Sequence, residues 1–362
     1  MTSRERVLRA AAHGKTDRIP VDYITRTDVM KKLINYLGLP DREALFKKLG
    51  IDIRKTGVAM ANPEFEEKAN GVLGGNSEKS GHRYIFHPDG TYEDSGGIIW
   101  RASDDGLYDE WIRGPLTDDP DLDKFHWPPL VGIESVESIT KRLSALDKEY
   151  ALLGTFNYPF KVCWQMRGLE NFLCDMLVDP GFAKALWIKT AEYETEKALR
   201  FIKAGGDIVG FSGDIAMQDR MMVSPHAWRE IDKPLFAEMI AKFKALKPDL
   251  LVFYHSDGNM EEVIPDLIEI GVDIIDPIQP ESMDVGYIKQ KYGKNFTLHG
   301  TISIQQTLPH GALGDVRKEV EHRMSLGKED GGIIIAPSNH VQNDTPLENI
   351  IEIYRTAGSF QE

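Results

Sequence analysis

The chain has 362 residues, of which about 41% are hydrophobic and 28% are charged, so it can bury a sizeable core and is not globally disordered. The net charge is −14 and no cluster of Lys and Arg stands out, which excludes nucleic acids and anionic membrane surfaces as partners. No apolar run approaches ~18 residues, the charged stretch at residues 1–15 is no secretory signal, and two cysteines make no disulfide framework. These features indicate a reduced, cytoplasmic environment.

The N-terminal third combines one predicted strand with an irregular stretch. Residues 17–23 (DRIPVDY) are typical of a first strand. Residues 55–130 hold a Pro-Asp-Gly turn between two strand-like runs and then a loop rich in Pro and Asp, which predicts a β-hairpin or meander. We expect this stretch to be an elaboration of a single domain over residues 1–362. A predicted helix over 134–147 leads into the regular part of the chain.

The rest of the sequence alternates strands and helices. A strand over 150–157 precedes helices across 166–203, and five strand–helix units follow. Each expected strand is a nearly continuous apolar run, as in parallel strands that are buried on both faces. The five strands are predicted at 205–211, 249–255, 272–277, 295–300 and 331–340, and the five helices at 224–247, 259–271, 285–293, 314–327 and 345–358.

This count favours a (β/α)8 TIM barrel with a β-hairpin or loop elaboration in its N-terminal third. An open doubly wound sheet is the alternative. Such a sheet usually shows a Gly-rich phosphate-binding turn early in the chain, and the sequence contains neither GxGxxG nor GxxxxGK[ST].

Polar side chains follow six of these strands, at the end where a TIM barrel carries its active site. Ordinary helix caps account for some of the Asp, Asn and Ser there, but not for three of the ten histidines of the chain. The two cysteines, Cys163 and Cys174, are expected to pack rather than to bind a metal. The candidate functional residues are therefore Asn157, Tyr158, Asp214, His255, Asp257, Asp276, Gln279, His299, Asn339 and His340.

Five blocks in chain order resemble the uroporphyrinogen decarboxylase superfamily, beginning with SRERVLRAAAHGKTDRIPVDY and ending with GGIIIAPSNHVQNDTPLENIIEIY. The resemblance covers nearly the whole chain and implies the barrel fold. True uroporphyrinogen decarboxylases bind their many-carboxylate tetrapyrrole with an Arg-Gln-Ala-Gly-Arg motif. Here that region reads VDYITRTDVMKKL, with Arg26 alone, so porphyrin decarboxylation is not expected.

The corrinoid-dependent methyltransferases of this superfamily hold zinc with a His-x-Cys pair and a later Cys. The matching positions are His255, Asp257 and Asn339, so the histidine is kept and both thiolates are replaced. The resemblance then implies a zinc site at His255 and Asp257, with His340 as the third ligand. A His and carboxylate site is a harder Lewis acid than a thiolate site, which suits a metal that polarises an ether or phenolic oxygen.

The leading hypothesis is a methyltransferase that moves a methyl group from a small methoxylated compound, such as an aromatic ether, or from an N-methylated compound, to a corrinoid on a separate protein. Two alternatives stay open, namely a metal-free decarboxylase or other lyase acting on a small acid, and a barrel that binds a ligand or a corrinoid partner without catalysis. A homodimer is also considered, although the sequence does not set the oligomeric state. The expected catalytic residues are Asp214, His299 and Asn157, and the expected substrate-binding residues are Tyr158, Gln279 and Asn339.

Overall fold

The computed structural model describes four stretches of the chain, residues 1–72, 83–104, 108–146 and 148–361. Parts of the expected elaboration therefore lie outside the described residues, at 73–82 and 105–107. Within the described stretches, no helix is both long enough and apolar enough to cross a membrane.

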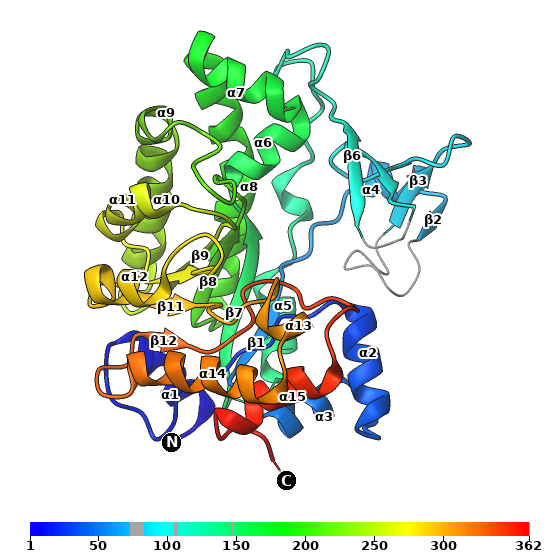
Figure 1. Ribbon diagram of the computed structural model, residues 1–362. Coiled ribbons are helices and arrows are strands. Elements are labelled where there is room, and N and C mark those ends of the chain that lie inside the picture. The colour runs from blue at the N-terminus through cyan, green and yellow to red at the C-terminus, as the bar shows by residue number, and fades with distance from the viewer. Residues whose placement is uncertain (73–82, 105–107, 147, 362) are drawn as a thin grey trace.

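Seven parallel strands form the central sheet, in the order β1-β7-β8-β9-β10-β11-β12 (Figure 1). An eighth position is filled by residues 19–25, which make parallel bridges at Val21–Ile335 and Thr25–Val341 on one side. On the other side, the Asp52 N–H donates to the carbonyl of Val21 at 3.0 Å. The sheet therefore closes into a barrel, as expected. Its strands are β1 Ile53–Thr56, β7 Ala151–Asn157, β8 Ile208–Ser212, β9 Leu251–His255, β10 Ile274–Asp276, β11 Thr297–His299 and β12 Ile333–Ile334.

Strand β1 is the barrel strand that the sequence pattern did not predict. Two of its four residues are charged, Arg54 and Lys55, so the apolar run typical of a buried parallel strand is missing. Lys55 pairs with the buried Asp22, with Nζ 2.7 Å from Oδ2. Arg54 lies over the ring of Tyr150, at 3.6 Å from its centroid. Arg54 also pairs with Glu43, with Nη2 2.9 Å from Oε1. Both charges are therefore satisfied by residues outside the strand, which the pattern of the strand itself cannot reveal.

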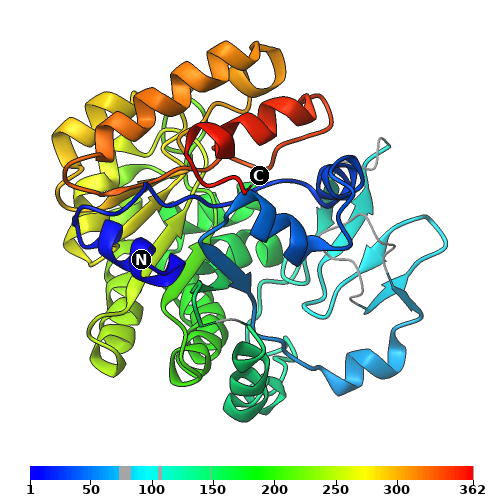
Figure 2. The same cartoon turned by 90° about the horizontal axis from the view of Figure 1, so that it is seen from below.

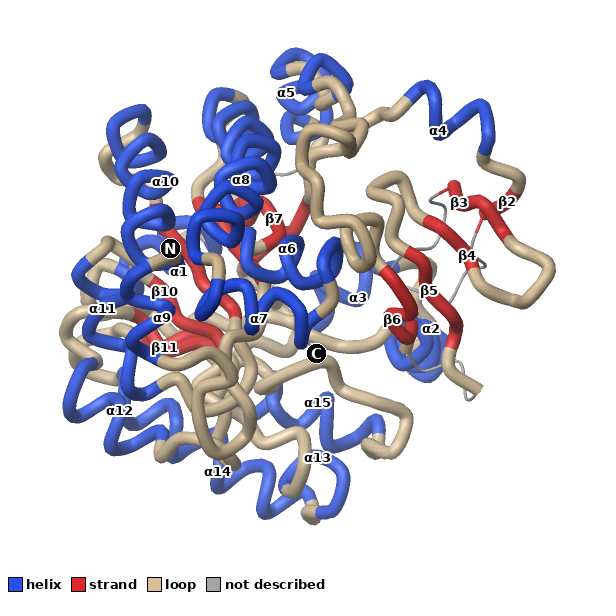
Figure 3. The backbone as a smooth tube through the Cα atoms, turned by 90° about the horizontal axis from the view of Figure 1, so that it is seen from above, coloured by secondary structure: helices blue, strands red, loops and turns tan. Residues whose placement is uncertain are grey.

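The helices surround the strands, as the view from above shows (Figure 3). The expected helix over 224–247 is two helices, α9 (Pro225–Glu230) and α10 (Asp232–Leu246). Pro234 causes the break, because its ring lacks an N–H and clashes with the carbonyl four residues earlier. The other helices are α1 Ser3–Ala11, α2 Thr27–Tyr36, α3 Arg42–Leu49, α4 Pro63–Lys68, α5 Val136–Ser144, α6 Pro159–Arg167, α7 Leu169–Val178, α8 Pro180–Lys203, α11 Ile264–Glu269, α12 Val285–Tyr292, α13 Thr307–His310, α14 Leu313–Gly327 and α15 Leu347–Thr356, with short 3-10 turns at Leu130–Gly132 and Glu261–Val263.

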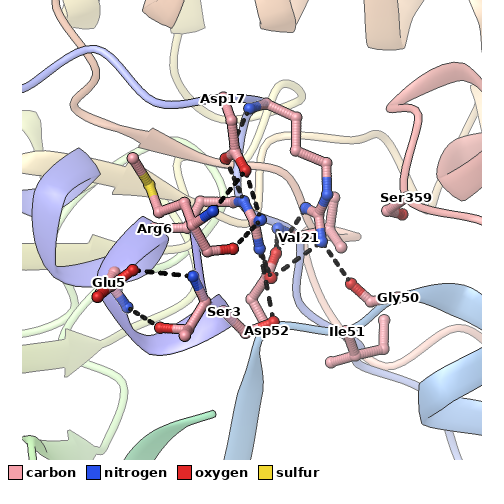
Figure 4. Close-up of polar contacts among 12 residues, drawn as sticks. Ser3, Glu5, Arg6, Asp17, Val21, Gly50, Ile51, Asp52 and Ser359 are labelled. Atoms are coloured by element: carbon pink, nitrogen blue, oxygen red, sulfur yellow. Dashed lines mark hydrogen bonds and ion pairs between the residues drawn. The ribbon is translucent and has the colours of Figure 1, made fainter. Parts of the chain in front are cut away.

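Helix α1 covers the N-terminal end of the barrel, where the view from below shows it across the strands (Figure 2). Val7 of this helix packs into the interior layer of apolar side chains that the strands contribute. Ion pairs fix the helix there (Figure 4). The fully buried Asp52 accepts hydrogen bonds from Arg6 at 2.6 Å, from Arg18 at 2.7 Å and from the N–H of Val21 at 2.9 Å. This end of the barrel is therefore sealed, and ligands have to enter from the other end.

The irregular N-terminal stretch forms a second sheet beside the barrel (Figures 1 and 3). Its five strands are antiparallel neighbours in chain order, in keeping with the expected meander. A small aromatic cluster of Tyr84, Tyr92 and Trp100 with Ile98 holds them together. These strands are β2 Gly71–Val72, β3 Arg83–Phe86, β4 Tyr92–Glu93, β5 Ile99–Ala102 and β6 Asp109–Arg113.

Candidate active site

The inward-facing positions of the barrel change from apolar to polar along each strand. In β9, Phe253 belongs to the apolar interior cluster and His255, two residues later, lines a cavity. In β10, Ile274 is followed in the same way by Asp276. Because side chains alternate between the two faces of a strand, residues two apart share a face. The carboxyl ends of the parallel strands therefore bring the polar groups together above the apolar layer.

Asp276 connects two histidines at this end. The Nδ1–H of His255 donates to Oδ2 at 2.6 Å, and the Nδ1–H of His299 donates to Oδ1 at 2.5 Å. His299 also donates through Nε2 to Asp22 at 3.0 Å, and Asp22 pairs with Lys55. The result is a buried chain of alternating charges across the barrel. It fixes the ring of His255 and leaves its Nε2 without a hydrogen bond among the described residues.

A second group lies in the loop after β9. The Asp257 N–H donates to Oδ1 of Asp214 at 3.0 Å, and Asn339 donates through Nδ2 to Oδ2 of Asp257 at 2.5 Å. The other oxygen of Asp257, Oδ1, is buried and has no hydrogen-bond partner. Gly258 permits this turn, since it has φ +87° and a Cβ there would lie 2.3 Å from the carbonyl oxygen of Met217.

These two groups meet in one cluster. One ligand atom from each of Asp214, His255 and Asp257 lies within 4.8 Å of the others. An unpaired buried carboxylate oxygen and a free imidazole nitrogen are costly without a cation, and both are ligand types that zinc accepts. Metal-binding histidines usually donate their other N–H to a carboxylate, as His255 does to Asp276. The residues present therefore fit a divalent cation with three protein ligands.

The charges of the cluster are reflected in its pKa values. Burial alone would lower the pKa of His255, but the hydrogen bond and charge of Asp276 raise it to about 9. Burial raises the pKa of Asp257 to about 6, and the charges of Asp214 and Asp276 add to the rise while His255 opposes it. Burial would raise the pKa of Asp276, yet its two histidines hold it well below its usual range. His255 thus carries a proton at neutral pH that a bound metal ion would displace.

A cavity of about 420 Å³ opens beside this cluster, within the range of small-molecule sites. His255, Asp276 and His340 line it on the side of the cluster, and Lys55 lines it from β1. The remaining wall combines the apolar side chains of Met30, Phe46, Leu153 and Phe253 with polar side chains. The cavity therefore combines titratable groups with a surface that suits an apolar or aromatic body.

Not all of the expected site residues reach this cavity. Asn339 and His340 do lie at the cluster, with Oδ1 of Asn339 accepting from the N–H of His340 at 2.5 Å. Asp214, expected as a proton donor, instead joins His255 and Asp257 as a third potential ligand. His340, expected in that place, lines the cavity wall and is not part of the three-ligand group.

The other four expected residues do not line this cavity. Tyr158 is fully buried and lies 3.4 Å from Asp232 through its hydroxyl, so it is a core residue. His299 is fully buried between two carboxylates, so it positions Asp276 and cannot reach a substrate directly. Gln279 accepts a hydrogen bond from the N–H of Gly258 at 3.3 Å and so supports the loop. Asn157 lines a different cavity, of about 330 Å³, beside the small sheet.

Sequence reasoning also missed Asp22 and Lys55. Asp22 lies in the predicted first strand (17–23), one residue after the Val21 bridge. It could have been found if the end of this strand had been included among the strand ends that carry site residues. Lys55 lies on the strand that the apolar pattern did not reveal. Cys163 packs as expected, since it is buried next to Thr190, whereas Cys174 is exposed and does not pack in the core.

Comparisons with known proteins agree with this architecture. A methyltransferase from Methanosarcina mazei superposes with a TM-score of 0.71 at 17% sequence identity, covering 99% of both chains. The glycoside hydrolase family 53 catalytic domain of Ignisphaera aggregans (TM-score 0.42, 14% identity, 94% of this chain and 96% of that chain) and a psychrophilic family 10 endo-β-1,4-xylanase (0.43, 11%, 92% and 88%) are more distant. The first likeness shows the shared fold, and the other two carry no argument.

A search of curated protein sequences finds no significant match. A family model does match, and its description is uroporphyrinogen decarboxylase (URO-D). The match runs over residues 112–360, which is more than half of the chain and includes every barrel strand from β7 to β12. The chain belongs to the uroporphyrinogen decarboxylase family.

Proposed function

We propose that this protein is a methyltransferase that takes a methyl group from oxygen or nitrogen of a small compound and passes it to the cobalt of a corrinoid on a separate protein. The observation that carries the proposal is the cluster of Asp214, His255 and Asp257 at the open end of the barrel. The barrel shares its fold with a protein described as a methyltransferase, which supports the same chemistry.

Some of the residues at the cluster would bind the metal ion, and others hold those ligands in place. Asp214, His255 and Asp257 would hold a zinc ion, which when bound supplies Lewis-acid polarisation of the donor heteroatom. Asp276 keeps the ring of His255 in place through Nδ1, and Asn339 keeps Asp257 turned toward the cluster. In metal sites, hydrogen bonds from residues behind the ligands usually hold the ligands in this way.

The leaving oxygen needs a proton when its bond to the methyl carbon breaks. The electron pair of that bond would stay on oxygen, and cobalt(I) of the corrinoid partner, when bound, would supply the pair for the new bond to carbon. Lys55 and His340 line the cavity and can each hold a proton for the oxygen. They take the role that the sequence suggested for Asp214 and His299, because His299 is sealed off from the cavity. The apolar wall excludes water from the donor.

A second candidate is decarboxylation of a small acid, which Lys55 on the cavity wall favours. The two reactions differ in their products, since decarboxylation releases carbon dioxide and needs no cobalamin. The third reading, a barrel that only binds a ligand, predicts neither product.

Methylation of cob(I)alamin tests the proposal. The zinc-reconstituted protein is mixed with free cob(I)alamin and a panel of methoxybenzenes, methoxybenzoates and N-methylated amines, and formation of methylcobalamin is followed by absorbance. We expect methylcobalamin and the demethylated product in equal amounts with wild type, and loss of at least a hundredfold in rate with His255→Ala. Carbon dioxide without methylcobalamin, or equal rates in the two proteins, would overturn the proposal.

A further inference from the structure

One wall of the cavity collects hydroxyl groups that are unpaired in the part of the chain that the structure describes. Tyr23 is 6% exposed and Thr25 lies two residues later, and both line the cavity. Neither hydroxyl oxygen meets a described residue at hydrogen-bonding geometry, although both are buried. Buried hydroxyl groups are normally satisfied, so two unsatisfied ones on the same cavity wall indicate a ligand contact.

Arg42 completes this wall. It is the first residue of α3, it lines the same cavity, and its guanidinium lies over the ring of Phe46 at 4.8 Å from the centroid. In the part of the chain that the structure describes, Arg42 makes no hydrogen bond and no ion pair. Phe46 connects Arg42 to Tyr23, because the ring centroids of Phe46 and Tyr23 lie 5.2 Å apart. Burial raises the pKa of Tyr23, and the nearby Thr25 hydroxyl and the charge of Arg42 act against that rise. The cation and the Tyr23 hydroxyl therefore lie at the same part of the wall.

The other cation on the cavity wall is already neutralised. Lys55 has its Nζ 2.7 Å from Oδ2 of Asp22, whose pKa Lys55 and His299 lower against the effect of burial. Arg42 is exposed and forms no such ion pair within the described stretches, where Glu43 and Asp22 act on it only through their longer-range charges. Its guanidinium is therefore open to a ligand at the cavity. A guanidinium donates and never accepts, so its complement is an anionic oxygen, and a carboxylate matches its planar fork.

We propose that Arg42, Tyr23 and Thr25 form a carboxylate-binding subsite, so that the methyl donor is a small carboxylic acid with a methylated heteroatom. This inference rests on the proposed function, since it names the substrate class of the same cavity. The carboxylate contacts Arg42 and the Tyr23 hydroxyl, and the rest of the molecule lies along Phe46 and Phe253. The methylated atom then points to the side of the cavity that His255 lines.

Paired ligands of one shape test the subsite. Calorimetric titration compares 3-methoxybenzoate with its neutral analogue 3-methoxybenzamide on the zinc-reconstituted protein. We expect the carboxylate to bind at least tenfold more tightly than the amide in wild type. Arg42→Gln should lose about ten- to a hundredfold in affinity for the carboxylate, as hydrogen bonds to charged groups usually contribute, and should leave the amide unchanged.

The chain offers a matched control. Arg355 lies over Phe360 at 4.9 Å, is exposed and has no acidic partner in the described residues, but it is not part of the cavity wall. Arg355→Gln should therefore bind both ligands as wild type does. Tyr23→Phe removes only the hydroxyl and should weaken carboxylate binding several-fold without lowering the melting temperature, because the hydroxyl has no partner to lose.

The results separate this inference from the proposed function. His255→Gln should keep the preference for 3-methoxybenzoate over the amide while it fails to methylate cob(I)alamin. Selective carboxylate binding through Arg42 without methyl transfer from any donor would keep the subsite and remove the proposed reaction. Equal affinity for the two ligands, no binding of the carboxylate at millimolar concentration, or unchanged affinity in Arg42→Gln would each overturn the subsite.

Discussion

Replacing Asp276 with Asn should weaken metal binding and change how stability depends on pH. The carboxylate accepts hydrogen bonds from His255 at 2.6 Å and from His299 at 2.5 Å, and it is almost fully buried. An amide of the same size keeps the packing but removes the charge. Contacts of this type around metal sites usually contribute 10- to 100-fold in affinity, so we expect zinc to bind that much more weakly to Asp276→Asn.

The pH dependence follows from His255. Its pKa rises from 6.5 to about 9 in the folded protein, roughly 2.5 units, and at 1.36 kcal/mol per unit the metal-free protein gains about 3 kcal/mol of stability. A raised histidine pKa contributes its stability below pH 6.5 and loses it as the pH rises toward 9. His299, whose pKa is also raised against the effect of burial, acts in the same direction. Asp276→Asn should therefore be most destabilised below pH 6.5 and approach wild type near pH 9.

Two assays check this prediction. Competition with a chromophoric chelator gives the zinc affinity, and urea denaturation of metal-free protein at several pH values gives the free energy of unfolding. The control is Asp232→Asn, which changes another buried aspartate that lies 2.9 Å from Trp187 Nε1 and does not line the cavity. Zinc affinity equal to wild type in Asp276→Asn, or a constant stability difference across this pH range, would refute the reasoning.

Four further changes test other parts of the structure. Burial raises the pKa of Asp232 to about 7, so wild type loses stability as the pH rises from about 4 to 7, and Asp232→Asn should be the more stable protein in urea at pH 9, by up to about 4 kcal/mol. Gly300→Ala should lower the melting temperature and the zinc affinity together, because the residue has φ +64° and a Cβ would lie 2.4 Å from Oδ1 of Asp276. Asp52→Asn should cost about 3–5 kcal/mol in urea denaturation and leave zinc affinity unchanged, since it strands two arginines at the closed end. Tyr158→Phe should keep methyl transfer within about twofold of wild type, because the ring packs in the core; a loss above tenfold would return this residue to the substrate site.

Most of the barrel could be predicted because its signals are local. Parallel strands such as 249–255 and 272–277 are short apolar runs that lie between predicted helices. The structure has β9 and β10 inside those two ranges. β1 is different, since its charges are paired with Asp22 and Glu43, which lie on other segments of the fold. The break before α10 was missed although Pro234 marks it, because the apolar spacing runs through it.

The sequence could predict which residues stand at the ends of the barrel strands, but not which other residues they contact. His255 and Asp257 follow β9 directly, and the structure brings them together with Asp214, which follows β8. What each side chain contacts depends on the neighbouring strands. His299 also stands at a strand end, but Asp22 and Asp276 enclose it from two sides. No spacing in the sequence distinguishes an enclosed histidine from an open one.

The subsite residues were missed for the same reason. Tyr23 and Thr25 lie in the segment that fills the eighth barrel position, where only isolated bridges form. Arg42 belongs to a helix, α3, that no sequence pattern places at the cavity. Their significance rests on missing partners, and a missing partner can only be recognised in three dimensions.

The most direct test of the central claim is an anomalous difference map, recorded at the zinc edge, from crystals grown with zinc. The account predicts one strong peak per chain, bounded by Nε2 of His255 and by carboxylate oxygens of Asp214 and Asp257, and absent in crystals of His255→Ala. A peak held by other residues, or no peak at the open end of the barrel, would contradict it.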